Sequence, residues 1–175
     1  FYKISFEDAN NLVKILEQYS IQNKFKKIFF VDTPSIYHRQ LDDTLEYLLH
    51  WHNFNIEEYY ISSKINIPQF PNSLDHLHAR KKRYVKSYLE DKELTVKLEN
   101  DFEQFYPILL ENKKKHNVTP THSLEELRKL NELHPRSFHL ILLYYKNIVI
   151  GGALNFIVNE NCGMVFYNMI DYDYI

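Results

Sequence analysis

The chain has 175 residues, and its 21 basic residues against 23 acidic ones give a formal net charge of -2. A charge this close to balance creates no overall field that would draw the molecule to nucleic acid or to an anionic membrane. The single cysteine, Cys162, excludes an internal disulfide framework and fits a reducing compartment, so we expect a cytoplasmic location. No apolar run approaches the roughly 20 residues that span a bilayer.

The first part of the chain predicts strands and helices in alternation. Loose alternation over residues 1–6 is typical of a strand, and the apolar run over 28–31 is typical of a strand buried on both faces. Apolar residues at helical spacing predict amphipathic helices over 8–23 and 37–52, and the aromatic segment 55–64 predicts a further strand. The whole segment therefore predicts the order strand, helix, strand, helix, strand.

A basic helix is expected after a loop that contains two prolines. Pro68 and Pro71 bracket the loop, and Asn72 or Ser73 can cap a helix that runs to about Glu90. Leucine, valine and tyrosine give this helix one apolar face, and the opposite face carries Arg80, Lys82, Arg83 and Lys86. Charges in this arrangement normally face water, so we interpret the basic face as solvated.

The last part of the chain predicts a strand, two helices and an antiparallel meander. The strand is LTVKL, the first helix covers 101–116, and the second begins at a capping box formed by Ser123 and Glu126. Three strands follow, over 137–145, 148–158 and 162–171, separated by turns at 146–147 and 159–161. The pair Gly151-Gly152 within the middle strand indicates a bulge or a close approach of another backbone. The predicted fold class is α/β of the α+β kind, with mixed, largely antiparallel sheets and flanking helices.

Three segments resemble a known family. They are SLDHLHARKKRYVKSY, DFEQFYPILLENKKKHNVTPTHSLEELRKL, and LILLYYKNIVIGGALNFIVN followed by GMVFYNMIDYDY. This pattern is similar to the GNAT N-acyltransferase superfamily, in the tandem arrangement of its Fem-type (FemAB-like) peptidyltransferase branch. On this mapping, 1–66 is the second half of one GNAT-like unit, 67–93 is a connecting loop and basic helix, and 94–175 is the first half of another unit. Because no Gly-rich loop for a coenzyme A pyrophosphate follows the last strand, we expect the chain to be a fragment of a longer acyltransferase.

The resemblance implies an N-acyltransferase that transfers an acetyl group from acetyl-CoA to an amine of a small molecule, an amino sugar or a peptide. In that chemistry the amine attacks the thioester directly, with no covalent enzyme intermediate. Main-chain amides of the last strand hold the donor and its developing oxyanion, and here they would come from Asn168, Met169, Ile170 and Asp171.

Three side chains are candidates for proton transfer under the same resemblance. His122 lies in the turn between the two helices and can take the proton of the attacking amine, with Glu125 as its partner or as an alternative base. Tyr167 can protonate the departing thiolate if its hydroxyl faces the donor. The plainer interpretation is that His122 and its neighbours only cap and orient the second helix.

Other interpretations stay open. The donor can instead be an aminoacyl-tRNA bound by the basic helix, in which case binding falls steeply with salt; otherwise we expect neither a nucleic-acid partner nor a membrane partner. A non-catalytic module with GNAT-like architecture is a third interpretation. An unpaired sheet edge would also favour a homo-oligomer.

No metal site is expected from the histidines. Closely spaced histidines stand two residues apart in predicted helices, where their side chains point in different directions. These pairs are His50 with His52 and His76 with His78.

Overall fold

The computed structural model describes residues 4–38, 40, 42–67 and 72–174. The chain divides into two compact units, Phe1–Ile65 (unit 1) and Asn66–Ile175 (unit 2). The helix that the sequence places in a separate connecting segment therefore belongs to unit 2.

In its described residues, unit 1 contains two helices, α1 (Phe6–Gln22) and α2 (Thr44–Trp51), and the short 3-10 helix η1 (Ser35–Tyr37). Ser5 caps α1, because its side chain accepts a hydrogen bond from the Asp8 amide. Among the described residues of this unit, the buried apolar side chains are Val13 of α1 and Leu48 of α2. This small core joins the two helices.

The strands predicted for unit 1 are wrong wherever the structure describes them. Residue 6 already belongs to α1, while 1–3 lie outside the described residues, and the segments 28–31 and 55–64 have no regular structure. Apart from the half-buried Ile28, their apolar side chains are exposed, Val31 by 87% and Ile61 by 97%. A strand needs a neighbour to pair its backbone, and among the described residues no backbone–backbone hydrogen bond reaches either segment.

The two predicted helices that span 37–52 and 72–90 are also shorter than expected. The first begins only at Thr44, where the Asp42 carboxylate accepts a hydrogen bond from the Thr44 amide at 3.0 Å. The second is divided into η2 (Asn72–His76) and α3 (Ala79–Glu90). His78 caps α3 by accepting a hydrogen bond from the Arg80 amide, so the helix starts there rather than at the predicted cap.

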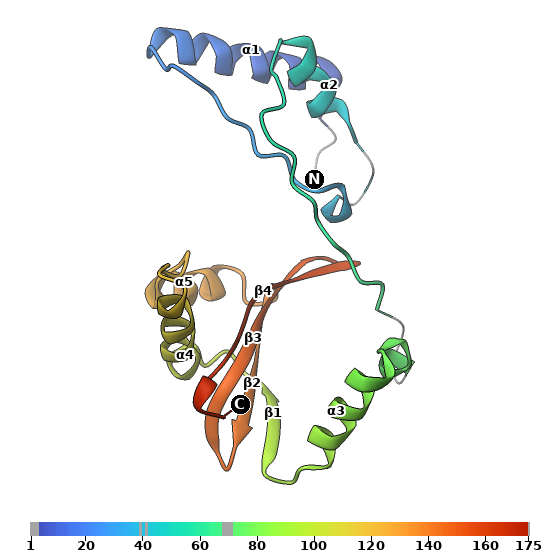
Figure 1. Cartoon of the computed structure of the whole chain (residues 1–175). Helices are drawn as coiled ribbons and strands as arrows, with labels where there is room; N and C mark the ends of the chain where they lie inside the picture. Colours follow the sequence, from blue (N-terminus) through green and yellow to red (C-terminus); the bar gives the residue numbers. More distant parts are fainter. Residues whose placement is uncertain (1–3, 39, 41, 68–71, 175) are drawn as a thin grey trace. The chain divides into compact units, whose positions relative to one another are not determined.

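Unit 2 is built on a four-stranded antiparallel sheet in the order β1-β2-β3-β4. The strands are β1 (Leu94–Leu98), β2 (Phe138–Tyr145), β3 (Ile148–Asn159) and β4 (Cys162–Ile170). Between β1 and β2 the chain forms α4 (Phe102–Lys115) and α5 (Leu124–Leu133), and after β4 it forms η3 (Tyr172–Tyr174). The predicted α+β class is confirmed, with helices flanking a fully antiparallel sheet (Figure 1).

Local sequence signals set the ends of these elements. Ser123 and Glu126 form the predicted capping box at the start of α5. Lys146 and Asn147 both have positive φ, 49° and 68°, as a two-residue hairpin turn requires. The meander over β2, β3 and β4 therefore follows the sequence prediction closely.

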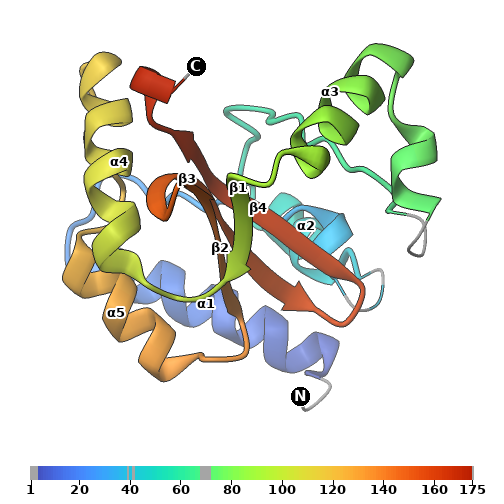
Figure 2. The ribbon, with the colours of Figure 1, turned by 90° about the horizontal axis from the view of Figure 1, so that it is seen from below.

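The helices α4 and α5 cover one face of the sheet (Figure 2). The core lies between the two helices and the sheet, and both layers contribute fully buried side chains to it: Phe105, Leu109, Leu127, Leu140, Leu142 and Leu154. The other face, which we call the open face, has apolar side chains that remain more than half exposed, among them Val96, Leu98 and Val165. The alternation of β2 produces this division, because its even-numbered residues are buried under the helices.

The glycine pair in β3 allows two close approaches. A Cβ on Gly152 would lie 2.7 Å from the Ile141 carbonyl oxygen and 3.1 Å from the Phe105 ring, and a Cβ on Gly151 would lie 2.8 Å from the Met169 carbonyl oxygen. A register shift between Leu143 and Tyr144 lies beside the pair, as the sequence indicates. Neighbouring protein atoms fill the space beside both glycines.

Candidate functional site

The strand β4 is bulged and lies at an edge of the sheet. Leu154 pairs with Tyr167 whereas Asn155 pairs with Val165, so Phe166 is an extra residue on β4. Its ring stacks on Phe156 at 4.5 Å between centroids. A bulge twists its strand and interrupts the ladder, and such features are frequent next to active sites.

Two backbone amides of β4 point away from the sheet. The Asp171 amide donates to the Ile150 carbonyl oxygen at 2.7 Å, and paired and unpaired positions alternate from there along the antiparallel ladder. The backbone N–H and C=O groups of Met169 are therefore directed at β3, while those of Asn168 and Ile170 point to the free edge of β4. We call the Asn168 and Ile170 amides the edge donors.

The buried side chain of Asn112 fixes the end of this edge. Its Nδ2 donates to the Ile108 carbonyl oxygen and to the Ile170 carbonyl oxygen, each at 2.9 Å. The second bond agrees with the outward direction of the Ile170 C=O group. It ties α4 to the end of β4. The Ile170 amide remains directed at the edge.

His122 lies against the bulge. Its ring centroid is 5.5 Å from that of Phe166, and its carbonyl oxygen accepts a hydrogen bond from the Tyr106 hydroxyl at 3.2 Å. Its Nδ1 is buried and has no hydrogen-bond partner among the described residues. A buried ring nitrogen without a partner is unusual in a folded protein and marks a position where a water molecule or ligand atom would be favourable.

Tyr167 is directed into the core beneath the helices. It is only 3% exposed, its hydroxyl accepts a hydrogen bond from the Thr121 amide at 3.0 Å, and Lys113 Nζ lies 5.6 Å from the ring centroid. This hydroxyl anchors the loop before α5 to β4. The structure therefore buries this hydroxyl under the helices rather than exposing it.

The acidic candidates lie outside this cluster. Glu125 is exposed in the first turn of α5 and has no recorded partner among the described residues. The neighbouring Glu126 forms the capping box, and hydrogen bonds from the Ser123 backbone and side chain hold the pKa of its carboxyl below the ordinary value. The Asp171 carboxylate accepts a hydrogen bond from the Asp173 amide at 3.0 Å and so helps to form η3.

The fold thus brings His122, Tyr167 and the bulge of β4 together, but not Glu125. Of the four residues expected to supply donor-binding amides, Asn168 and Ile170 offer their amides to the edge, whereas the Met169 and Asp171 amides face β3. The sequence shows the strand but not which amides are free, because that depends on the register of the ladder.

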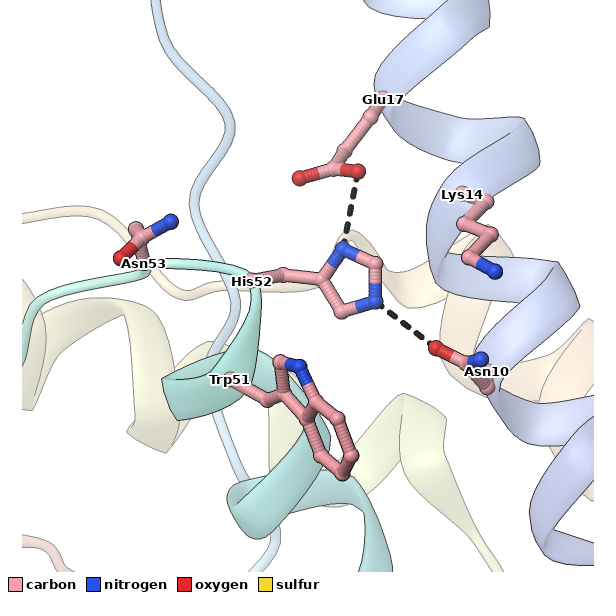
Figure 3. Close-up of a pocket in the computed structure, with 6 residues that line it drawn as sticks. All are labelled: Asn10, Lys14, Glu17, Trp51, His52 and Asn53. Carbon is pink, nitrogen blue, oxygen red and sulfur yellow. Dashed lines mark hydrogen bonds and ion pairs between the residues drawn. The ribbon is translucent and has the colours of Figure 1, made fainter.

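A pocket of about 410 Å³ lies in unit 1 between α1 and the end of α2 (Figure 3). At its centre, His52 Nδ1 lies 2.9 Å from Glu17 Oε2 and His52 Nε2 lies 2.8 Å from Asn10 Oδ1 (Figure 3). Lys14, Trp51 and Asn53 complete the lining.

The His52 contacts explain this pocket as a joint between the helices. An ionised Glu17 carboxylate and the Asn10 Oδ1 both only accept hydrogen bonds, so each ring nitrogen donates to its partner. A ring bound at both nitrogens is not free to take a proton from a substrate, and we assign His52 to holding α2 against α1. No local pattern in the sequence indicates this contact, because His52 and Asn10 are 42 residues apart.

The described residues also bear on metal ions and membranes. In this part of the chain, no three His, Cys, Asp or Glu side chains gather as a metal ion would require. Within the same residues, no helix combines the length and the apolar character needed to cross a bilayer.

Comparison with family models, with curated proteins and with solved structures found no match for the chain. The architecture and the geometry of β4 therefore carry the functional argument.

Proposed function

We propose that the chain belongs to an N-acyltransferase and that the free edge of β4 is its donor-binding edge. The reaction moves an acetyl group from acetyl-CoA to an amine of a small molecule, an amino sugar or a peptide. The observation that carries the proposal is the pair of edge donors, Asn168 and Ile170, beside a bulge in the same strand.

The arrangement of unit 2 supports the proposal. The order strand, helix, helix, strand, strand, strand is the one that the resemblance to GNAT proteins implies for the first half of such a unit. The residues that flank each edge donor are hydrogen-bonded to β3, so the edge donors are held rigidly in place. Such amides are suited to stabilising negative charge, because they need no reorganisation when that charge develops.

The reaction would proceed in two steps, addition of the amine and loss of the thiolate. The amine nitrogen attacks the thioester carbon, the new C–N bond forms, and the carbonyl oxygen takes the electron pair and hydrogen-bonds to the edge donors. The oxyanion then collapses, the C–S bond breaks, and the CoA thiolate leaves and is protonated. The attacking nitrogen loses its proton to a base.

Two side chains remain candidates for that base. His122 has an unpartnered Nδ1 beside the bulge, and Glu125 has an exposed carboxylate nearby in sequence. The packing of Tyr167 favours a positioning role through the Thr121 amide, and its role as a proton donor stays a prediction.

Proline substitutions test the edge donors directly. Asn168→Pro and Ile170→Pro each remove one outward N–H while leaving the bonds to β3 intact, which is the situation in which an edge strand tolerates proline. Val96→Pro is the matched control, because the Val96 amide points to the opposite edge of the sheet. The Glu99 amide donates to the Leu140 carbonyl oxygen, and bonded and free positions alternate from there along β1.

The readout is proton–nitrogen correlation NMR of the whole chain during addition of acetyl-CoA or of the smaller thioester S-acetylpantetheine. We expect the Asn168 and Ile170 amide signals to move, and either edge variant to lower the affinity at least tenfold while Val96→Pro leaves it unchanged. Unchanged affinity in folded edge variants would refute the role of the edge donors. If neither thioester binds, a non-catalytic module becomes the better interpretation.

A further inference from the structure

The helix α3 exposes an apolar stripe. None of its residues is buried, and Tyr84, Tyr88 and Leu89 are exposed by 44%, 63% and 69%. Helices of globular units normally bury their apolar stripe against a neighbour. In both views, α3 lies on the other side of the sheet from α4 and α5 (Figures 1 and 2).

Cations border this stripe. At 100° per residue, Tyr84, Val85, Tyr88 and Leu89 fall on one side of α3, and Lys81 lies among them. Arg80 lies at one border of that side, and Lys82 and Lys86 lie at the other. Over its twelve residues α3 carries five basic side chains, the three named with Lys81 and Arg83, against the single acidic Glu90.

Few of these charges are neutralised by the protein. Lys82 forms an ion pair with Asp75, and this contact holds the pKa of the Asp75 carboxyl below its ordinary value. Arg80 lies 5.7 Å from the centroid of the Tyr84 ring, which leaves its charge uncompensated. Lys86 forms no hydrogen bond or ion pair with the described residues and interacts at longer range with the Asp75 carboxylate, which already pairs with Lys82. The helix therefore presents a net positive charge beside exposed apolar area.

We propose that α3 binds in the plane of a membrane surface that is rich in anionic lipids. A bilayer surface complements both features together, since its headgroups attract the cations while the upper acyl region covers the stripe. A nucleic acid would complement the charge alone and would leave Val85 and Leu89 in water. At 1.5 Å per residue α3 is roughly 18 Å long, shorter than the hydrocarbon core of about 30 Å, so it lies along the surface and does not cross it.

Co-sedimentation of the whole chain with lipid vesicles tests this proposal. Vesicles of phosphatidylserine and phosphatidylcholine are compared with vesicles of phosphatidylcholine alone. Each cation near an anionic surface is worth about fivefold in binding, so Arg80→Gln with Lys82→Gln and Lys86→Gln weakens it about a hundredfold. The matched control removes three exposed lysines elsewhere in unit 2 by Lys92→Gln, Lys114→Gln and Lys129→Gln, and keeps its binding.

A second variant separates lipid from other polyanions. Tyr88→Gln with Leu89→Gln keeps every charge but removes half of the stripe, and these exposed positions can change without loss of core packing. We expect this variant to lose vesicle binding at unchanged net charge. The proposal is overturned if the chain does not prefer anionic vesicles, or if the control triple weakens binding as much as the α3 triple. It is also overturned if the stripe variant binds like the parent, in which case α3 is a site for a polyanion such as RNA.

Discussion

Replacement of Gly152 by alanine is expected to destabilise unit 2. The added Cβ would lie 2.7 Å from the Ile141 carbonyl oxygen, 3.0 Å from Leu142 Cδ2 and 3.1 Å from Phe105 Cδ2. The first of these contacts is with the backbone of the neighbouring strand, and the last is with α4 above it. No flexible side chain can move away to relieve both.

The size of the effect follows from those distances. Carbon–oxygen contacts between strands settle at roughly 3.3 Å, so the Ile141 carbonyl oxygen would have to retreat by roughly half an ångström. Overpacking of this kind costs about 1–3 kcal/mol. Replacing glycine by alanine also lowers the conformational entropy of the unfolded chain, which stabilises the fold by about 0.4–1 kcal/mol. We therefore expect a net loss of about 1–2 kcal/mol in the free energy of unfolding.

Gly163→Ala provides the matched control within the same sheet. A Cβ there would meet only Ile157 Cδ1 and the Phe156 carbonyl oxygen, both at the ordinary contact distance of 3.5 Å. This variant should be neutral or more stable by up to about 1 kcal/mol. Urea unfolding of both variants, extrapolated linearly, measures the difference. Equal stability of Gly152→Ala and Gly163→Ala would refute the close packing of α4 on β3.

Three further predictions concern hydrogen bonds. Asn112→Ala leaves the Ile170 carbonyl oxygen without its donor, and we expect a loss of about 1–3 kcal/mol, measured by urea unfolding, with a neutral result contradicting the bond. His52→Phe keeps a ring but removes both ring nitrogens, so amide hydrogen exchange in α1 should accelerate about fivefold or more, for a loss of about 1 kcal/mol; unchanged exchange would argue against the joint between the helices. Ser123→Ala removes the cap of α5 and should cost about 1 kcal/mol at neutral pH. Because the pKa of Glu126 is lowered in the folded state, the contribution of its carboxylate to the capping box is complete above the ordinary value of 4.5 and is lost as the pH falls through the lowered value. The bond from the Glu126 amide to the Ser123 hydroxyl does not depend on pH. The gap between parent and variant should therefore narrow in acid but remain, and a gap that vanishes there would contradict the assignment of the Ser123 hydroxyl as the cap.

Local chemistry determined much of unit 2. The capping box at Ser123, the turn at Lys146 and Asn147, and the alternation within β2 each act through neighbours a few residues away, so the sequence alone predicts α5, the hairpin and the buried face of β2. The glycine pair likewise predicts a close approach of another backbone, and the neighbouring strands confirm this prediction. Such signals need no knowledge of distant segments.

The same kind of reasoning failed in unit 1. The runs at 28–31 and 55–64 have the composition of strands, but a strand forms only when another strand takes up its backbone hydrogen bonds. Among the described residues neither segment has such a partner, so a strong local preference produces no strand. The helices α1 and α2 did form, since a helix satisfies its backbone internally.

The candidate site divides in the same way. The sequence by itself identified β4 and the turn that carries His122, because both are visible as local patterns. Only the tertiary structure decided that the Asn168 and Ile170 amides face the free edge, that Tyr167 is packed under the helices, and that His122 lies on the bulge. The reason is physical: a shift of the ladder by one residue would exchange the free amides for the paired ones without altering a single local preference.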